Sequence, residues 1–407
     1  MTGQPNILWI VTTQWRAAAT GYAGDPNART PWLDGLASEA VNYAQAVTPH
    51  PLGPQARAAL LTGKRCPENG VSDYWDPLPA EVRTVAHALR DRGYATAFFG
   101  KWHLAERDRT APLVGEAHAK MIVPPERRGG FEFWEGFESG FLLNDPWLHG
   151  TRLPEPRHFK GYQAEVLVQR AAEWVGRGEK PGGRGERPGF CVVSLESPHP
   201  PYHAPAPHVA ERPPAEIELR ANVPCGGEAE KQARAELAGY YAHIEATDRA
   251  IGKLMAEVDL SGTAVVFTSV HGDMLGSHGA FRKGWPYEES IRVPLLVRGP
   301  PGKVKSGLSN EPVALVDLPH MAVAWAEGRE WHCKRDSASI SMTGATVIPG
   351  QCERTWHGFR TPRHKLVLNT DGSPWLYFDL EHDPLEMKNL ATEPARLREM
   401  EALMRLM

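Results

Sequence analysis

The 407-residue chain lacks three features that would mark a specialised class of protein. Its five cysteines are an odd number, stand far apart and show no paired spacing, so neither a disulfide framework nor a zinc motif is indicated. The net charge of −4 is close to neutral, which argues against a nucleic-acid surface or a polybasic membrane face. No run of about 18 apolar residues is present to span a bilayer.

The N-terminus also carries no recognisable targeting signal. Met1 to Pro5 leads directly into the apolar run Asn6 to Val11, which is too short for a signal peptide and has no basic residues or small-residue cleavage site beside it. Together with the cysteine usage, this favours a cytoplasmic protein. The composition, 42% apolar and 23% charged, is that of an ordinary globular protein with a sizeable core.

Short apolar runs alternate with segments of helical spacing. Asn6 to Val11 is typical of a strand buried on both faces of a parallel sheet. Later runs have the same character, at Phe190 to Leu195, Ala264 to Thr268 and Val293 to Val297. Helical spacing occupies Glu81 to Arg92 and Leu237 to Val258. Strands that alternate with helices predict an α/β fold with a doubly wound sheet.

Two further segments indicate how the chain is organised. Gly176 to Gly189 is rich in glycine, proline and charge, so we expect a flexible surface loop there. Thr361 to Asn369 and Trp375 to Leu380 flank an Asp-Gly turn, which predicts a β-hairpin. We therefore predict an α/β domain over residues 1–355, with the loop at 176–189, and a C-terminal subdomain over 356–407 with an antiparallel hairpin and a terminal helix.

Several sequence blocks, in the same order, resemble the sulfatase family of the alkaline phosphatase superfamily. They are Pro5 to Val11, Thr30 to Ala37, Arg57 to Gly63, Gly93 to Leu104, Ser197 to Tyr202, Tyr240 to Asp248, Lys283 to Pro294 and Phe378 to Pro384. They look most like the bacterial branch with arylsulfatases, choline sulfatases and phosphonate monoester hydrolases. The resemblance implies an alkaline phosphatase-like sandwich, with a large, mostly parallel sheet flanked by helices and a small C-terminal antiparallel sheet.

Ester hydrolysis in this family needs a nucleophile, a divalent cation and cationic side chains. The resemblance places the nucleophile, the first residue of Cys/Ser-x-Pro-x-Arg, at Gly53 in the segment that ends at Arg57. Glycine has no side chain that can attack an ester. A one-residue slip puts Leu52 there, which is equally inert, and neither form of the motif occurs elsewhere in the chain.

The metal carboxylates implied by the resemblance are missing in the same way. The two acidic positions, after the first strand and after the strand ending at Thr268, correspond to Thr13 and Val270. Gln14 and His271 match the two neutral ligand positions. A hard divalent cation loses its hydration water when it binds, and neutral ligands without carboxylates compensate poorly for that loss. We therefore expect no metal and no cofactor, and an atypical divalent metal stays open as an alternative.

The residues that bind the anion are, by contrast, all present. Those that match the family's substrate-contacting positions are Arg57, Lys101, His103, His199 and Lys283. Several follow predicted strands, so we expect them to converge at the carboxyl edge of the sheet. The expected ligand is a small molecule bearing sulfate, phosphate, phosphonate or carboxylate. We expect no nucleic-acid or membrane partner, and a homo-oligomer stays open.

Two hypotheses about function follow, and the sequence does not decide whether the chain is an enzyme. The chain is either a pseudoenzyme that binds an anion, or an enzyme repurposed as a lyase, transferase or hydrolase without formylglycine or a metal. The candidate acid, base or anion-contacting groups are Lys101, His103, His199, His271 and Lys283.

An active sulfuric, phosphoric or phosphonic ester hydrolase is the alternative, and it needs replacements for the missing groups. Candidate metal ligands are Asp273, Glu288 and Glu289, and candidate nucleophiles are Thr12, Thr13 and Ser269. Zinc is a less favoured alternative because its histidines show no ligand spacing; they are His103, His199, His271 and His278.

Overall fold

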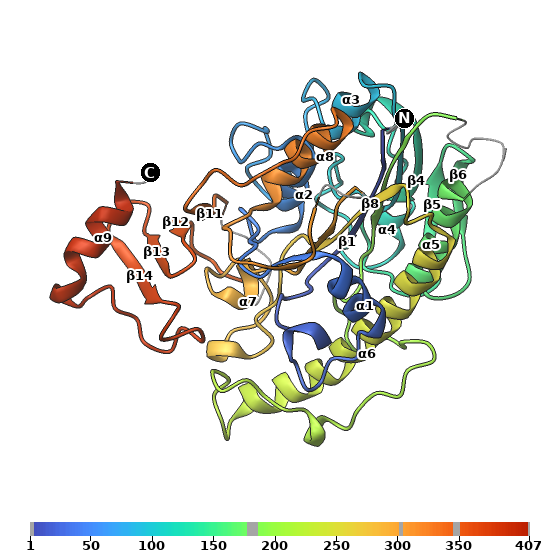
Figure 1. Ribbon diagram of the computed structural model, residues 1–407. Coiled ribbons are helices and arrows are strands. Elements are labelled where there is room, and N and C mark those ends of the chain that lie inside the picture. Colours follow the sequence, from blue (N-terminus) through green and yellow to red (C-terminus); the bar gives the residue numbers. More distant parts are fainter. Residues whose placement is uncertain (1–3, 177–185, 301–303, 345–350, 406–407) are drawn as a thin grey trace.

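The computed structural model describes residues 4–176, 186–300, 304–344 and 351–405. Within them a ten-stranded sheet has the order β10-β2-β9-β8-β1-β7-β3-β4-β5-β6 (Figure 1). The strands are β1 (Asn6–Thr12), β2 (Val41–Tyr43), β3 (Ala95–Lys101), β4 (Phe133–Phe137), β5 (Trp147–Gly150), β6 (Leu153–His158), β7 (Gly189–Ser194), β8 (Thr263–Ser269), β9 (Leu295–Arg298) and β10 (Gly307–Ser309). The five neighbours from β8 to β4 are parallel.

Side chains of the central strands point alternately into two apolar layers. In β1, Leu8 and Ile10 belong to one layer, and Ile7, Trp9 and Val11 to the other. The first layer packs under α1 (Pro31–Glu39), α5 (Gln163–Val175) and α6 (Glu228–Glu257), and the second under α2 (Gly53–Thr62), α3 (Val85–Arg90) and α8 (Leu318–Ala326). Figure 1 shows these two groups of helices on opposite sides of the strands. This burial on both faces explains the continuous apolar runs of the central strands.

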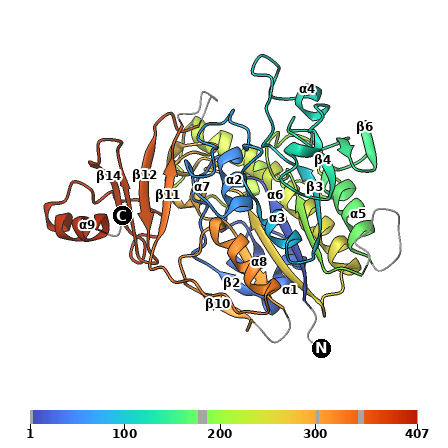
Figure 2. The ribbon, with the colours of Figure 1, turned by 90° about the horizontal axis from the view of Figure 1, so that it is seen from above.

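A second, four-stranded antiparallel sheet lies at one side of the molecule (Figure 2). Its strands are β11 (Ala338–Met342), β12 (Trp356–Arg360), β13 (His364–Leu368) and β14 (Pro374–Asp379), with α9 (Leu397–Met404) against them. The short helices α4 (Glu116–Ala119) and α7 (Glu288–Ile291) complete the set. The predicted fold class, a mostly parallel sheet flanked by helices with a small C-terminal antiparallel sheet, is confirmed.

The predicted elements differ from the structure in detail. The run ending at Val297 forms β9, which is antiparallel to both neighbours, because a buried apolar run specifies burial and not direction. The helix expected from Glu81 begins at Val85, where the Thr84 hydroxyl caps it by accepting the Ala86 N–H.

Parts of the predicted organisation are not decided by the fold. Most of the predicted 176–189 loop, residues 177–185, lies outside the described residues, and Gly189 already begins β7. The domain division at residue 355 stays a prediction, and the small sheet takes its first strand from before it. Of the helices described, none has the length and apolar character needed to cross a membrane.

Candidate functional site

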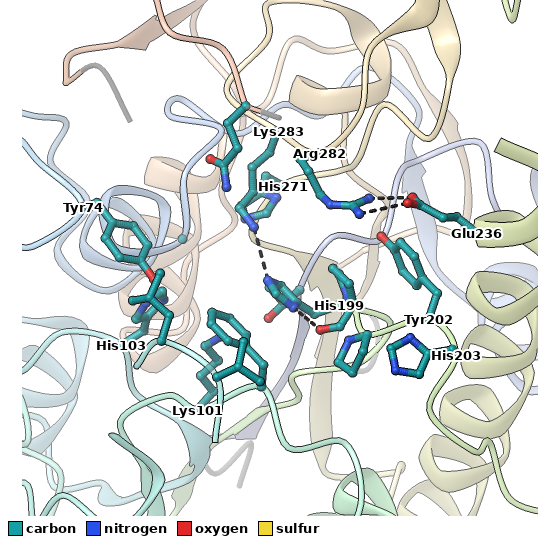
Figure 3. Close-up of a pocket in the computed structure, with 18 of the residues that line it drawn as sticks. Tyr74, Lys101, His103, His199, Tyr202, His203, Glu236, His271, Arg282 and Lys283 are labelled. Atoms are coloured by element: carbon teal, nitrogen blue, oxygen red, sulfur yellow. Dashed lines mark hydrogen bonds and ion pairs between the residues drawn. The ribbon is translucent and has the colours of Figure 1, made fainter. Parts of the chain in front are cut away.

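The carboxyl ends of four parallel strands bring the predicted residues to one edge of the sheet. Thr13 and Gln14 follow β1, Val270 and His271 follow β8, Lys101 ends β3, and His199 follows β7. A cavity of about 530 Å³ lies over this edge (Figure 3). The predicted residues that line it are Thr13, Gly53, Lys101, His103, His199, His271 and Lys283.

Backbone geometry at the strand ends helps to direct these side chains. Gln14 and His103 have φ values of 66° and 59°, in the left-handed region that non-glycine residues seldom adopt. Gly100, with φ 104°, precedes Lys101 at a point where a β-carbon would collide with the carbonyl oxygen of Ser194. Glycine therefore lets β3 and β7 approach closely just before the chain enters the site.

Gly53 is the first residue of α2 and faces two nitrogen donors. A β-carbon built on it would lie 2.9 Å from His103 Nδ1 and 3.5 Å from Arg57 Nη1. Arg57 donates from Nη2 to the Thr13 hydroxyl at 2.7 Å, while its Nε and Nη1 have no hydrogen-bond partner among the described residues. Two buried donors therefore point to the position that a side chain at Gly53 would occupy.

Hydrogen bonds define the tautomers of the three imidazoles. His103 Nε2 accepts from the Arg107 guanidinium at 2.8 Å, which leaves the proton on Nδ1 beside Gly53. His199 Nδ1 donates to the Pro200 carbonyl at 2.7 Å, and His271 Nδ1 donates to the Gly272 carbonyl at 2.9 Å. The site thus presents a donor at His103 and acceptors at Nε2 of His199 and His271.

Lys283 contacts Gln14, which the resemblance matches to a metal-ligand position. Lys283 Nζ donates to Gln14 Oε1 at 2.5 Å and contacts His199 Nε2 at 3.2 Å. Gln14 Nε2 in turn donates to Asp273 at 2.5 Å, and the Tyr202 hydroxyl donates to the same carboxylate oxygen at 2.5 Å. Thr13 and Val270 stand where the resemblance implies carboxylates, and Lys283 already holds the Gln14 amide oxygen, so this set of side chains does not fit a hard divalent cation.

Lys101 lies under the cavity in a buried ion pair. Its ammonium is 2.6 Å from Glu196 Oε1, with side chains that are 1% and 0% exposed, and 4.4 Å from the centre of the Phe141 ring. Gln163 donates to the second oxygen of Glu196 at 3.1 Å. Phe141 also stacks on His199, with ring centres 4.4 Å apart. Lys101 therefore contributes positive potential at the floor, with one carboxylate already opposite it.

Comparisons with known proteins identify the family of this chain. The family model described as Sulfatase matches residues 5–328. The chain is 34% identical to the ulvan-active sulfatase of Formosa agariphila over 96% of this chain and 78% of that protein. The chain belongs to the sulfatase family. The predicted membership of the alkaline phosphatase superfamily is confirmed.

Two solved structures establish the same fold for this sulfatase-family chain. One, solved in complex with its substrate D-glucosamine-2-N,6-O-disulfate, has a TM-score of 0.78 and 22% identity, covering 99% of this chain and 96% of the other. The phosphonate monoester hydrolase of Agrobacterium radiobacter has a TM-score of 0.73 and 21% identity, covering 99% and 95%.

Burial controls the charge of the site in this sulfatase-family protein. It lowers the pKa of Lys283 to about 7, reinforced by the Lys101 charge, and lowers the pKa of Lys101 to about 8 against the opposing effect of Glu196. Burial and the surrounding cations hold the pKa values of the three imidazoles well below their usual range. Arg57, whose pKa burial lowers to about 10, remains charged near neutral pH.

The carboxylates considered as replacement metal ligands, Asp273, Glu288 and Glu289, do not line the cavity. Asp273 accepts from Gln14 as described above. Glu288 is ion-paired with Arg360 at 3.0 Å and Glu289 with Arg220 at 3.2 Å, and neither glutamate lines the cavity. The two glutamates therefore serve ion pairs within the fold, and Asp273 serves hydrogen bonds to Gln14 and Tyr202.

The candidate nucleophiles are similarly engaged. Thr12 donates to the Thr268 carbonyl at 3.2 Å, and Ser269 donates to the His271 carbonyl at 2.9 Å. Neither lines the cavity, whereas Thr13 does. The Thr13 hydroxyl donates to the Leu195 carbonyl at 3.0 Å and accepts from Arg57, so its proton and one lone pair are already used.

The histidines considered for zinc are not grouped as ligands of one ion. Within the described ranges, two sets of His, Cys, Asp and Glu side chains lie close enough to share one: His278 with Glu289 and Glu386, and Asp379 with Glu381 and His382. Neither set contains His103, His199 or His271. His278 stacks on Tyr287, with ring centres 4.1 Å apart, away from the cavity lining.

The upper wall of the cavity was not identified from the sequence. One side is apolar, with Leu113 and Val114 from the loop before α4. The other is polar, where Arg282 bonds Glu236 through both nitrogens at 2.6 and 2.9 Å (Figure 3). Tyr202 ends one of the sulfatase-like sequence blocks and Arg282 directly precedes another, whereas Leu113 and Val114 lie in a segment with no motif and no periodic pattern.

Proposed function

We propose that this sulfatase-family protein binds a small anionic molecule at the floor of the cavity and does not cleave sulfate esters with a formylglycine nucleophile and a metal. The observation that supports this most directly is the pair of donors facing Gly53. His103 Nδ1 and Arg57 Nη1 have no hydrogen-bond partner among the described residues, and both lie beside the space that a side chain at Gly53 would enter. An anion oxygen in that space, in contact with the Gly53 backbone, can accept hydrogen bonds from both groups.

The charge distribution supports the same proposal. Among the described residues, Lys101 and Arg282 have carboxylate partners, whereas no ion pair is formed by Arg57 or Lys283. A buried cation without a counter-charge is costly, and a bound anion compensates it. A sulfate, phosphate, phosphonate or carboxylate group supplies both the charge and the acceptors.

Sulfate or phosphate is therefore expected to raise the melting temperature of the protein, since a ligand that binds only the native state stabilises it. Gly53→Ala is expected to remove most of this shift, because its methyl group takes the position beside His103 Nδ1. Gly35→Ala is the matched control, since a β-carbon at this α1 glycine meets no atom within 4 Å. An equal sulfate shift in wild type and Gly53→Ala would place the anion elsewhere.

Anion affinity is also expected to fall as pH rises. The lowered pKa values of Lys283 and Lys101, about 7 and 8, mean that both lysines lose protons between about pH 6 and pH 9. An anion favours their protonated forms, so binding takes up protons and weakens over this range, by at least about tenfold for sulfate. Calorimetric titration at several pH values, in buffers of different ionisation enthalpy, measures both effects. A pH-independent affinity would exclude both lysines from the site.

A sulfated saccharide is the first organic ligand to test, because the relatives include an ulvan-active sulfatase and a structure with bound glucosamine disulfate. We expect such a ligand to bind without release of inorganic sulfate, in the presence or absence of Ca²⁺. Sulfate release from an aryl sulfate or a sulfated sugar, dependent on Ca²⁺ or Mg²⁺, would instead establish the active ester hydrolase.

A further inference from the structure

The Lys283 side chain faces two hydrogen-bond acceptors in fixed orientations. Its Nζ has two hydrogen-bond partners among the described residues, Gln14 Oε1 and His199 Nε2. Gln14 cannot turn its amide without losing the bond from Nε2 to Asp273, so its oxygen stays directed at the amine. When the amine is neutral, its two N–H groups can donate to these two acceptors, which leaves its lone pair free to attack a carbonyl carbon.

His199 is oriented as a base toward the same nitrogen. Its Nδ1 proton is fixed on the Pro200 carbonyl at 2.7 Å, so Nε2 presents a lone pair to Lys283 at 3.2 Å. A nucleophile, a base within hydrogen-bond reach and a third group that orients the base form the usual arrangement for covalent catalysis. Figure 3 shows the Lys283 side chain pointing to the His199 ring, with a dashed line joining the two.

We propose that Lys283 forms an imine with an aldehyde or ketone that carries an anionic group, and that His199 moves the protons. This rests on the proposed anion site at Gly53, which holds the charged group while the carbonyl carbon meets the amine. Lys283, Gly53 and His103 line one cavity, so a single small molecule can reach both ends. The chemistry requires neither a metal nor a formylglycine.

The step is balanced without a further reactant. The Nζ lone pair attacks the carbonyl carbon, the C=O π bond breaks, and one amine proton passes through His199 Nε2 to the oxygen to give a carbinolamine. His199 takes the second N–H proton and delivers it to the hydroxyl group, which leaves as water as the C=N bond forms.

The test is reductive trapping on the full-length protein with glyoxylate and cyanoborohydride, followed by peptide mapping. Near neutral pH, Lys283 is expected to be alkylated at least about tenfold faster than an exposed lysine such as Lys388, whose side chain is 71% exposed. Sulfate is expected to slow labelling at Lys283 and leave Lys388 unchanged. Labelling of Lys283 no faster than Lys388, or unaffected by sulfate, would overturn the proposal.

A second variant tests the role of His199 separately. His199→Gln keeps the amine but removes the imidazole base, so labelling of Lys283 is expected to slow by about tenfold or more while that of Lys388 is unchanged. An unchanged rate at Lys283 would exclude His199 as the proton carrier. The effect of sulfate on the melting temperature of the wild type separates the two proposals. If sulfate raises the melting temperature but Lys283 is not trapped, the anion site stands and only the imine proposal is contradicted.

Discussion

Replacing Thr13 and Val270 together by aspartate is expected to create a Ca²⁺ site in a protein whose wild-type residues do not fit one. The two positions lie side by side, since Val270 donates its backbone N–H to the Thr12 carbonyl at 3.0 Å. Both side chains are buried, so the new carboxylates should destabilise the metal-free protein by about 2–5 kcal/mol. Ca²⁺ at 100 times its dissociation constant should restore about 2.7 kcal/mol.

Melting curves with and without Ca²⁺ measure this effect. Thr13→Asn with Val270→Asn is the matched control, because it supplies similar shapes without charge and should melt at the same temperature with or without Ca²⁺. The metal must displace Lys283 from Gln14 Oε1, so Lys283→Met in the aspartate background should strengthen Ca²⁺ binding further. If the aspartate variant gains no stability from Ca²⁺, the assignment of Thr13 and Val270 to the family's carboxylate positions is wrong.

Ester cleavage additionally requires a nucleophile. Gly53→Ser in the aspartate background places a hydroxyl beside His103 Nδ1 and Arg57 Nη1, where the imidazole must shift slightly to accept the new β-carbon. Ester cleavage requires the nucleophile and the metal together. Once either of them is lost, the other no longer contributes to cleavage. Retention of the cationic residues at the same edge is consistent with continued binding of an anion.

The sequence predicted those parts of the site that follow directly from strand ends and family motifs. Lys101 and His199 each sit at or just after a buried parallel strand, and such ends meet at one edge of a sheet. Gly53 was predicted as the nucleophile position, and it faces the same cavity. The direction of β9 was not predictable, because burial on both faces gives the same run of apolar residues in either direction.

The hydrogen bonds and ring contacts that determine the chemistry of the site could not be predicted from the sequence. Lys283 contacts Gln14, which is 269 residues away, and the Phe141 ring reaches Lys101 from a loop without motif or periodicity. The tautomers of His103 and His199 depend on Arg107 and the Pro200 carbonyl, so they follow only from the packed structure. Pairing between distant loops leaves no local pattern in the sequence.

Lys101→Met is expected to destabilise the protein by about 3–5 kcal/mol, because it leaves Glu196 buried as an unpaired carboxylate with Gln163 as its remaining side-chain donor. Denaturant unfolding measures the loss. The matched control is Lys253→Met, which breaks an ion pair to Glu165 whose lysine side chain is 58% exposed and should cost less than about 1 kcal/mol.

The double variant Lys101→Met with Glu196→Gln separates stability from binding. The second substitution replaces the unpaired Glu196 carboxylate by a neutral amide that can still accept a hydrogen bond from Gln163. Most of the stability lost in the single variant should therefore return. Sulfate affinity should not return, because the positive charge at the cavity floor is still missing. Restored sulfate binding would show that Lys101 serves only to neutralise Glu196, and the anion site would then rest on Arg57, His103 and Lys283 alone. Failure to regain stability would instead mean that the lysine stem packs against Phe141 in a way that methionine cannot replace.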